Sequence, residues 1–364
     1  MKKFSVGTIV AISLCCFAIS LSGYPEYLDI PLRENLLLEN KVFDPDTIVL
    51  SGGGAKGVAY AGTLRYLEEA GKLENVSRFA GSSAGSIFAF ICYLGISSEE
   101  ADEIIKNIDW PSLVDSDIPL LKIMKDFHLI WKDVNYLKAI GDLAAFWGLT
   151  KGDAIENLLR GILKKQGFTD DGYITFAQIK GRVEARIPEN SKVKSKDLYV
   201  VACSMAYNKT AVLSFSTTPN MDVVSAIRAS MAIPFIFMPL KVDKNGEAIK
   251  NFEEAYDVLV DGGTTYNYPI EYFDKMGAKS LGFVLSPKDA YFNPPRKEIR
   301  HIGNYTSACM SLLTDNIGPR IIANEDRTIF IDTKSVGTLS FDMTPAERDE
   351  AINQGYLSTK EYFE

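Results

Sequence analysis

The segment TIVLSGGGAKGVAYAGTLRYLEEAG, residues 47–71, decides the fold class of this chain. Its first four residues are apolar or β-branched and predict a short, fully buried strand. Three glycines follow shortly after, and apolar residues then recur at helical spacing until Gly71, which suits the end of a helix. The segment RFAGSSAGSIFAFICYLG, residues 78–95, repeats this order of strand, glycine-containing turn and apolar helix. Two such units in succession predict an α/β fold with a parallel sheet.

The rest of the chain continues this pattern in what we interpret as one elaborated domain over residues 44–364, preceded by a polar lead over residues 24–43. Further strands are predicted at 198–202, 211–215, 258–260, 281–285 and 328–331, and further helices after Ser97, over 222–231 and after Thr344. From about 110 to 167 the pattern is helical, without a convincing strand. This stretch predicts a helical insertion, and it holds all three tryptophans, Trp110, Trp131 and Trp147.

The composition is that of an ordinary globular protein. Of the 364 residues, 46% are hydrophobic and 24% are charged, which excludes a mainly disordered chain and a multi-pass membrane protein. The 39 basic and 47 acidic side chains give a net charge of −8. Because nucleic-acid binding relies on a basic surplus, we expect no nucleic-acid partner. Nothing in the sequence identifies a protein partner.

The N-terminus has the layout of a secretory signal peptide. Met1-Lys2-Lys3 is followed by the apolar run Phe4–Leu21 and by small residues near its end. We therefore expect residues 1–23 to be cleaved and the protein to be exported, either secreted or periplasmic. If the segment is not cleaved it can serve as a membrane anchor, since roughly 18 apolar residues begin to span a bilayer.

The cysteines and histidines indicate neither a disulfide framework nor a metal site. Cys92 and Cys203 lie within apolar runs and are predicted to be buried thiols. No cluster has metal-ligand spacing, and the chain has only two histidines. We therefore expect chemistry without a metal and without any other cofactor.

The first motif with chemical potential is the turn Gly81–Gly85, which has the pattern G-x-S-x-G. Small residues two positions either side of a serine permit the sharp strand-to-helix turn that lifts a hydroxyl above a sheet. The helix that follows directs the positive end of its dipole toward that hydroxyl. We interpret Ser83 as a candidate nucleophile and Gly81 and Gly85 as the glycines of its elbow. The competing interpretation is a plain glycine turn.

The second motif, Gly52–Gly57, reads GGGAKG and also lies between a strand and a helix. Its backbone N–H groups can face an anion. It satisfies a dinucleotide-binding pattern, but no carboxylate ends the second strand, and it lacks the G-K-[ST] of a P-loop. An oxyanion hole from Gly52, Gly53 and Gly54 fits best, because this loop and the serine turn follow neighbouring parallel strands. Lys56 either adds positive charge near an oxyanion or a lipid phosphate, or is a solvated lysine.

The third motif, Asp261-Gly262-Gly263, directly follows a predicted strand. A carboxylate at the end of a sheet strand suits a general base beside a nucleophile, although Asp-Gly is also a common turn dipeptide. A triad of Ser83, Asp261 and His301 is possible, whereas a Ser83–Asp261 dyad needs no histidine. His128 precedes Asp261 in the chain and lies in the predicted insertion, where a packing or surface role is favoured.

Together these motifs resemble the patatin-like phospholipase family. The resemblance rests on four ordered blocks: Gly52–Gly57, Gly81–Gly85, Ala226–Pro234 and Asp261–Gly263, with Asn267-Tyr268-Pro269 shortly after the last. Ser51 stands where the family often has an acidic residue. The resemblance implies a three-layer α/β/α fold with a mostly parallel central sheet. It also implies a lipid acyl hydrolase of phospholipase A or lysophospholipase type, acting on membrane lipid or phospholipid through Ser83 as nucleophile, Asp261 as general base, and the N–H groups of Gly53 and Gly54.

Two other functions remain open on the sequence. One is a nucleotide-binding oxidoreductase that uses Gly52–Gly57, and the other is a catalytically silent lipid-binding or effector protein on the same fold. The aromatic side chains of the insertion suit an acyl groove or a lipid-facing lid, and equally they suit packing within the insertion's own core.

Overall fold

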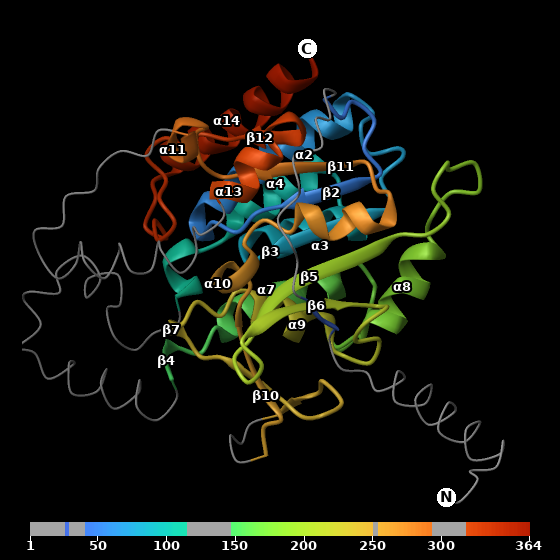
Figure 1. Cartoon of the computed structure of the whole chain (residues 1–364), viewed down its shortest axis with the longest axis vertical. Helices are drawn as coiled ribbons and strands as arrows, with labels where there is room; N and C mark the ends of the chain where they lie inside the picture. The colour runs from blue at the N-terminus through green and yellow to red at the C-terminus, as the bar shows by residue number, and fades with distance from the viewer. Residues whose placement is uncertain (1–25, 29–40, 115–146, 250–253, 293–317) are drawn as a thin grey trace, which may run out of the picture.

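The computed structural model describes residues 26–28, 41–114, 147–249, 254–292 and 318–364, and its centre is a ten-stranded sheet (Figure 1). Five strands run parallel in the order β12 (Thr328–Phe330), β11 (Ser280–Val284), β2 (Thr47–Leu50), β3 (Arg78–Ser82) and β5 (Asp197–Ser204). Antiparallel strands continue the sheet around β5: β10 (Asp257–Asp261), β8 (Leu240–Val242), β9 (Ala248–Ile249), β6 (Lys209–Ser214) and β1 (Glu26–Leu28).

The sheet is therefore mixed, and the prediction of a mostly parallel sheet holds for the half that carries the two glycine-rich turns. In the other half, short connections join antiparallel neighbours; residues 205–208 alone join β5 to β6, which is too short for a crossover helix. The predicted strands at 47–50, 78–80, 198–202, 211–215, 258–260, 281–285 and 328–331 are all confirmed, with ends that differ by a few residues.

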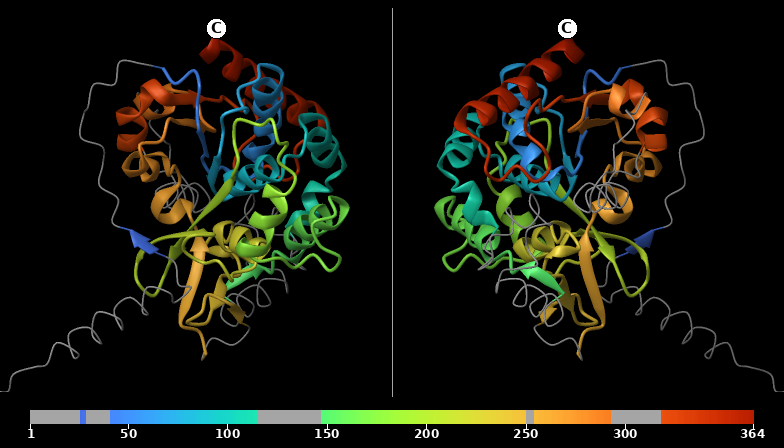
Figure 2. Two further views of the ribbon diagram at one scale, coloured as in Figure 1. Left: turned by 90° about the vertical axis from the view of Figure 1, so that its right-hand side faces the viewer. Right: turned by 90° about the vertical axis from the view of Figure 1, so that its left-hand side faces the viewer.

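Helices cover both faces of the sheet, which confirms the three-layer α/β/α fold (Figure 2). Along β2 the side chains alternate, so that Ile48 and Leu50 join one hydrophobic core and Val49 joins the other. The larger core contains α2 (Tyr60–Glu69), α3 (Ala84–Leu94), α4 (Ser98–Asn107), α7 (Asp153–Lys165), α8 (Phe176–Glu184), α9 (Val223–Ser230) and α14 (Pro345–Phe363). The smaller core contains α10 (Gly263–Tyr266), η4 (Ile270–Met276) and α13 (Gly318–Ala323).

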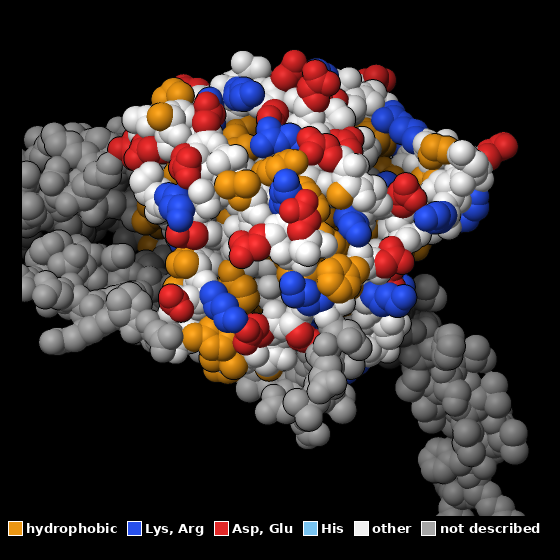
Figure 3. Space-filling model, turned by 90° about the horizontal axis from the view of Figure 1, so that it is seen from above, with side chains coloured by type: hydrophobic (Ala, Val, Ile, Leu, Met, Phe, Trp, Pro, Cys, Tyr) orange, Lys and Arg blue, Asp and Glu red, His pale blue; other side chains and the backbone are white. Residues whose placement is uncertain are grey.

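The predicted helix starts are present with side-chain caps. Ser97 accepts a hydrogen bond from the N–H of Glu100 at the start of α4, and Asp222 accepts one from the N–H of Ser225 at the start of α9. Thr344 and Glu347 form a complete capping box at the start of α14. Seen from above, the molecule carries acidic and basic side chains interspersed with small hydrophobic patches (Figure 3).

The predicted helical insertion is only partly described. Its ends contain η2 (Trp110–Leu113) and α7, but also the short strand β4 (Gly148–Thr150), which pairs with β7 (Phe235–Phe237). The prediction of an insertion without strands is thus wrong at residues 148–150. Trp131 lies outside the described residues, and so do the predicted signal peptide at 1–23 and most of the polar lead. Within the described residues no helix is both long and apolar enough to cross a bilayer.

The contact between α2 and α14 depends on two glycines. A Cβ atom on Gly62 would lie 1.8 Å from the carbonyl oxygen of Ile352, and one on Gly355 would lie 1.9 Å from that of Ala59. The two helix backbones therefore approach as closely as glycine permits. This contact holds the C-terminal helix against the helix that follows the glycine-rich loop.

We expect Gly62→Ala to destabilise the protein by about 2 kcal/mol or more, because the added methyl group must separate two packed helices. The matched substitution Gly161→Ala in α7 meets no atom within 4 Å. Since alanine is the better helix former, that variant should gain about 0.5–1 kcal/mol. Urea unfolding of the two variants measures both changes, and equal effects would contradict the close contact.

Candidate active site

Ser83 occupies a strained turn between β3 and α3. Its φ of 51° and ψ of −127° lie in a region that side-chain-bearing residues rarely adopt, as expected for a nucleophile elbow. The turn needs its two glycines, since a Cβ on Gly81 would lie 2.2 Å from the carbonyl group of Gly85 and a Cβ on Gly85 would lie 2.2 Å from the carbonyl oxygen of Leu50. The Ser83 side chain is 6% exposed.

Asp261 reaches Ser83 because β3 and β10 meet end to end along one edge of β5. β6 pairs with residues 199–204 of β5, so β3 and β10 must share the opposite edge. There Ser82, the last residue of β3, is paired with Val201, and Asp261, the last residue of β10, is paired with Ala202. Two strands that run toward each other therefore end at neighbouring positions of a third.

Burial dominates the electrostatics of Asp261. The side chain is 2% exposed, and this burial raises the pKa of the carboxyl group to about 7. Hydrogen bonds from the Ser83 hydroxyl and the Gly263 N–H oppose that rise. The Gly263 N–H donates to Oδ1 at 2.7 Å, while Oδ2 is buried and has no hydrogen-bond partner among the described residues.

The end of α9 ties the two turns together. The Ser230 hydroxyl accepts a hydrogen bond from the Ser83 N–H at 2.8 Å and donates one to the Val201 carbonyl oxygen at 2.5 Å. The backbone carbonyl of Ser230 accepts a hydrogen bond from the Gly262 N–H at 3.2 Å. Ser230 therefore contacts the serine turn, the aspartate turn and β5 at once. Ser230 lies within the motif block Ala226–Pro234, but the sequence pattern alone does not indicate this linking role.

The three glycines predicted to form an oxyanion hole differ from one another. The Gly52 N–H donates to the Asn267 side-chain Oδ1 at 3.0 Å and contacts the Asn267 backbone carbonyl at 3.3 Å, so this amide is already occupied. The N–H groups of Gly53 and Gly54 have no acceptor among the described residues. Gly52 therefore anchors the loop, and only its two successors offer donors. Asn267, whose contact with Gly52 spans 215 residues, could not be recognised as this anchor from local sequence.

The remaining contacts hold the loop from the C-terminal side. Gly54 has a φ of 56°, and a Cβ there would lie 2.2 Å from the carbonyl oxygen of Thr338. That same carbonyl accepts a hydrogen bond from the Ala55 N–H at 2.9 Å. The Lys56 ammonium group donates to the Leu285 carbonyl at 3.2 Å, which places its charge beside the loop.

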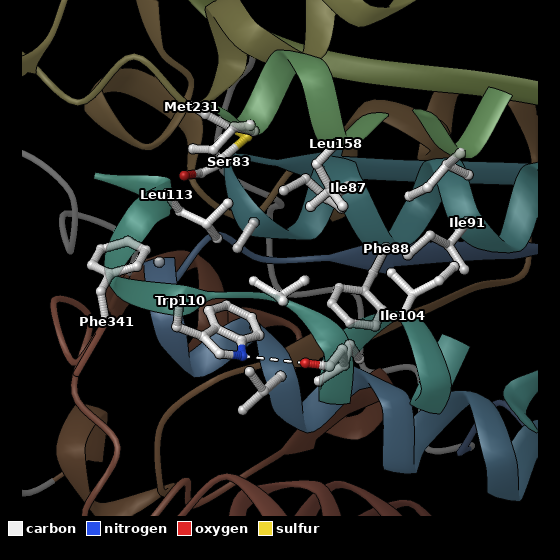
Figure 4. Close-up of a pocket in the computed structure, with 18 of the residues that line it drawn as sticks. Ser83, Ile87, Phe88, Ile91, Ile104, Trp110, Leu113, Leu158, Met231 and Phe341 are labelled. Carbon is white, nitrogen blue, oxygen red and sulfur yellow. Dashed lines mark hydrogen bonds between the residues drawn. The ribbon is translucent and has the colours of Figure 1, made fainter. Parts of the chain in front are cut away.

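Two cavities meet at Ser83. One is almost entirely apolar, and Figure 4 shows Ser83 and Met231 near one of its ends and Ile91 and Ile104 near the other. The second is more polar, which is why we call it the polar cavity, although its wall also includes Ile233, Leu285 and Tyr291. Its other lining residues besides Ser83 are Gly52, Gly53, Gly54, Lys56, Asp261, Asn267, Ser286 and Thr338. Gly54, Ser83 and Ile233 border both cavities. The candidate nucleophile thus stands at the boundary between an apolar and a polar compartment.

Several predicted features cannot be placed. His301 and His128 lie outside the described residues, so the choice between a dyad and a triad stays a prediction.

Other predicted features are described. Trp110 lines the apolar cavity, whereas Trp147 is about half exposed. Over the described part of the chain, no group of three or more His, Cys, Asp or Glu side chains could hold a metal ion. Cys203 is a buried free thiol as predicted, and Cys92 is a partly buried one.

Comparison with known proteins assigns this architecture to a family. The sequence model of the patatin-like phospholipases matches residues 48–274, which is more than half of the chain, and the protein belongs to this family. Its relatives include the uncharacterized protein YqhO of Bacillus subtilis, which is 28% identical over 86% of this chain and 96% of its own length. A probable lipid hydrolase, 463L of Invertebrate iridescent virus 6, is 23% identical over 77% of this chain and 82% of its own length.

A solved structure shares the fold. VipD from Legionella pneumophila superimposes with a TM-score of 0.54 and 21% identity, over 88% of this chain and 67% of that one.

The family membership implies a lipid substrate and argues against a nucleotide-binding oxidoreductase. That alternative also loses structural support, because the first amide of the glycine loop already binds Asn267.

The raised pKa of Asp261 predicts a pH-dependent stability. The folded protein keeps the carboxyl proton up to about pH 7, whereas the unfolded chain releases it near 3.8. This group therefore stabilises the fold most below its unfolded pKa, and that contribution is lost as the pH rises through 7. An asparagine side chain cannot ionise, so the gain in stability of Asp261→Asn over the natural chain should be larger at about pH 8.5 than at about pH 5.

Urea unfolding of both proteins at these two pH values measures the effect. Since all other titrating groups are common to the two chains, they largely cancel in the comparison. A stability difference that is the same at both pH values would contradict a carboxyl pKa raised by burial.

Proposed function

We propose that this protein is a serine acyl hydrolase that cleaves carboxylic esters of lipids, of phospholipase A or lysophospholipase type, through a dyad of Ser83 and Asp261. One observation carries the proposal: the ends of β3 and β10 bring the strained serine of the G-x-S-x-G turn against a buried carboxyl group. The family membership and the apolar cavity beside Ser83 support a lipid substrate.

In the proposed reaction the Ser83 oxygen attacks the ester carbonyl carbon while the Asp261 carboxylate takes the hydroxyl proton. The carbonyl oxygen becomes an oxyanion that accepts hydrogen bonds from the N–H groups of Gly53 and Gly54. Collapse of this intermediate breaks the bond to the alcohol, which leaves with the proton held by Asp261. Water then attacks the acyl-serine and gives a proton to Asp261. Collapse of the second tetrahedral intermediate breaks the bond to the Ser83 oxygen, which takes this proton back from Asp261, and the fatty acid leaves.

The environment of Asp261 suits this task. An aspartate with an ordinary pKa near 3.8 is a weak base for a serine hydroxyl, whereas a pKa of about 7 makes the carboxylate a stronger base that is still partly ionised at neutral pH. The buried Oδ2, which has no hydrogen-bond partner among the described residues, is the atom that we assign to proton transfer.

Export belongs to the proposal as well. The apolar run Phe4–Leu21 after two lysines is the supporting observation, and cleavage near residue 23 would release the enzyme to a secreted or periplasmic location. If the segment is retained, it would anchor the enzyme to a membrane.

Ser83→Ala should abolish ester hydrolysis, and a fluorophosphonate probe should label the natural chain but not this variant. Ser112→Ala, an exposed serine in η2, serves as the matched control and should keep both properties. The kcat/KM of the natural chain should rise with pH through about 7, because protonated Asp261 cannot accept a proton. Absence of labelling and of hydrolysis in the natural chain would favour the catalytically silent lipid-binding protein instead.

Two further variants separate the dyad from a triad. In a dyad, Asp261→Asn loses about 10³-fold or more in kcat while His301→Ala keeps most activity. A hydrolase that survives the first substitution and fails with the second would use His301 as its base.

Asn267→Ala tests the anchor of the oxyanion loop. Without the hydrogen bond to the Gly52 N–H, the donors of Gly53 and Gly54 lose their alignment, and we expect kcat to fall about 10- to 100-fold. KM should change much less, because the loop would act on the transition state. Asn107→Ala, at the exposed end of α4, is the control. A change confined to KM would contradict the positioning role.

A further inference from the structure

We infer that the site selects esters with a single acyl chain, in which the fatty acyl group occupies the apolar cavity and a polar alcohol without a second chain occupies the polar cavity. The inference rests on the proposed function and narrows its substrate class. Two observations support it. The two cavities meet at Ser83, and only the polar cavity contains Asp261, the proposed proton donor for the leaving alcohol.

The chemistry of the leaving group fixes the orientation of the substrate. In the proposed reaction the departing alcohol oxygen must receive its proton from Asp261, so the alcohol part of the ester must lie on the Asp261 side of Ser83. Asp261 lines the polar cavity and does not line the apolar one. The acyl chain is therefore left with the apolar cavity, which begins at Ser83 and Gly54.

The apolar cavity suits one acyl chain. It runs from Ser83 past Ile87 and Phe88 toward Ile91 and Ile104 (Figure 4). The polar atom of its largest side chain is satisfied, since the Trp110 indole N–H donates to the Ile105 carbonyl oxygen at 3.3 Å. The indole ring therefore offers carbon surface to the cavity. Burial of methylene groups against such a wall provides the driving force for binding the acyl chain.

The polar cavity offers no comparable wall for a second chain. Of its lining residues in the described part of the chain, only Ile233, Leu285 and Tyr291 are large and hydrophobic. The other side chains in its wall are Lys56, Asp261, Asn267, Ser83, Ser286 and Thr338. A second acyl chain placed here would strip water from these polar groups without replacing their hydrogen bonds, which disfavours a diacyl lipid.

The same wall recognises a hydroxylated or phosphorylated alcohol. The Lys56 ammonium group is held at the cavity by the Leu285 carbonyl, and Ser286 and Thr338 add polar side chains. Such groups pair with hydroxyl or phosphate oxygens. Both a lysophospholipid and a monoacylglycerol present this chemistry on the alcohol side of a single ester bond, so the experiment must separate them.

The test compares matched lipids in detergent mixed micelles at equal mole fraction. Palmitate release is measured from palmitoyl lysophosphatidylcholine, monopalmitoylglycerol and dipalmitoylphosphatidylcholine, with a short nitrophenyl ester as a measure of the dyad itself. We expect kcat/KM for the two monoacyl lipids to exceed that for the diacyl lipid by about tenfold or more. Equal or faster hydrolysis of the diacyl lipid, with the nitrophenyl ester cleaved normally, would overturn the inference and leave the proposed function intact. Failure to cleave any of the four would overturn both.

Lys56→Met tests whether the polar cavity recognises the phosphate group of a lysophospholipid or the hydroxyl groups of a monoacylglycerol. If the lysine contacts phosphate, KM should rise severalfold for the lysophospholipid and less for the monoacylglycerol. Lys164→Met replaces an exposed lysine on α7 as the matched control, and it should leave KM unchanged for both lipids. An equal rise for both lipids would overturn phosphate recognition by Lys56.

Discussion

The position of the candidate site depends on the pairing of one edge of β5 with two strands that approach from opposite directions. Val201 holds the end of β3 and Ala202 holds the end of β10, and consecutive residues of a strand lie only about 3.3 Å apart along its axis. A slip of one residue in either ladder would move a terminal side chain by that distance and turn it to the other face of the sheet. The register of β5 therefore sets whether the Ser83 hydroxyl and the Asp261 carboxyl group, far apart in the chain, can interact.

The surrounding contacts convert this register into a defined chemical environment. Ser230 links the two turns to β5, which limits the movement of the strained Ser83 backbone. Asp261 is buried, so its carboxyl group keeps a proton to about pH 7, and the resulting cost in stability grows from about pH 3.8 and is complete near pH 7. The fold therefore holds a buried carboxyl group whose ionised form is destabilising and supports it with the N–H of its own turn, a pattern that is common at functional sites.

The local elements of this fold could be predicted from the sequence, and the long-range contacts could not. Short apolar strands, glycine turns and capped helices leave patterns in consecutive residues, and so Ser83, Asp261 and the glycine loop were recognised. The antiparallel half of the sheet left no such signal, because strand direction depends on pairing rather than on side-chain period. β4 was missed because three residues, one of them glycine, are too few for a periodic pattern. The occupied amide of Gly52 depends on Asn267, and no local pattern could distinguish it from the neighbouring glycines.

The segment after the family match completes the geometry of the oxyanion loop. The match ends at residue 274, yet the carbonyl of Thr338 fixes the Ala55 N–H and leaves room at Gly54 only for a glycine. Phe341 closes part of the apolar cavity, and α14 then packs against α2 through Gly62 and Gly355. Because these residues border both the glycine loop and the apolar cavity, changes in this C-terminal segment can alter the alignment of the Gly53 and Gly54 N–H groups and the shape of the cavity. The family match contains the proposed reacting groups, whereas Thr338 and Phe341, which border the two cavities, lie outside it.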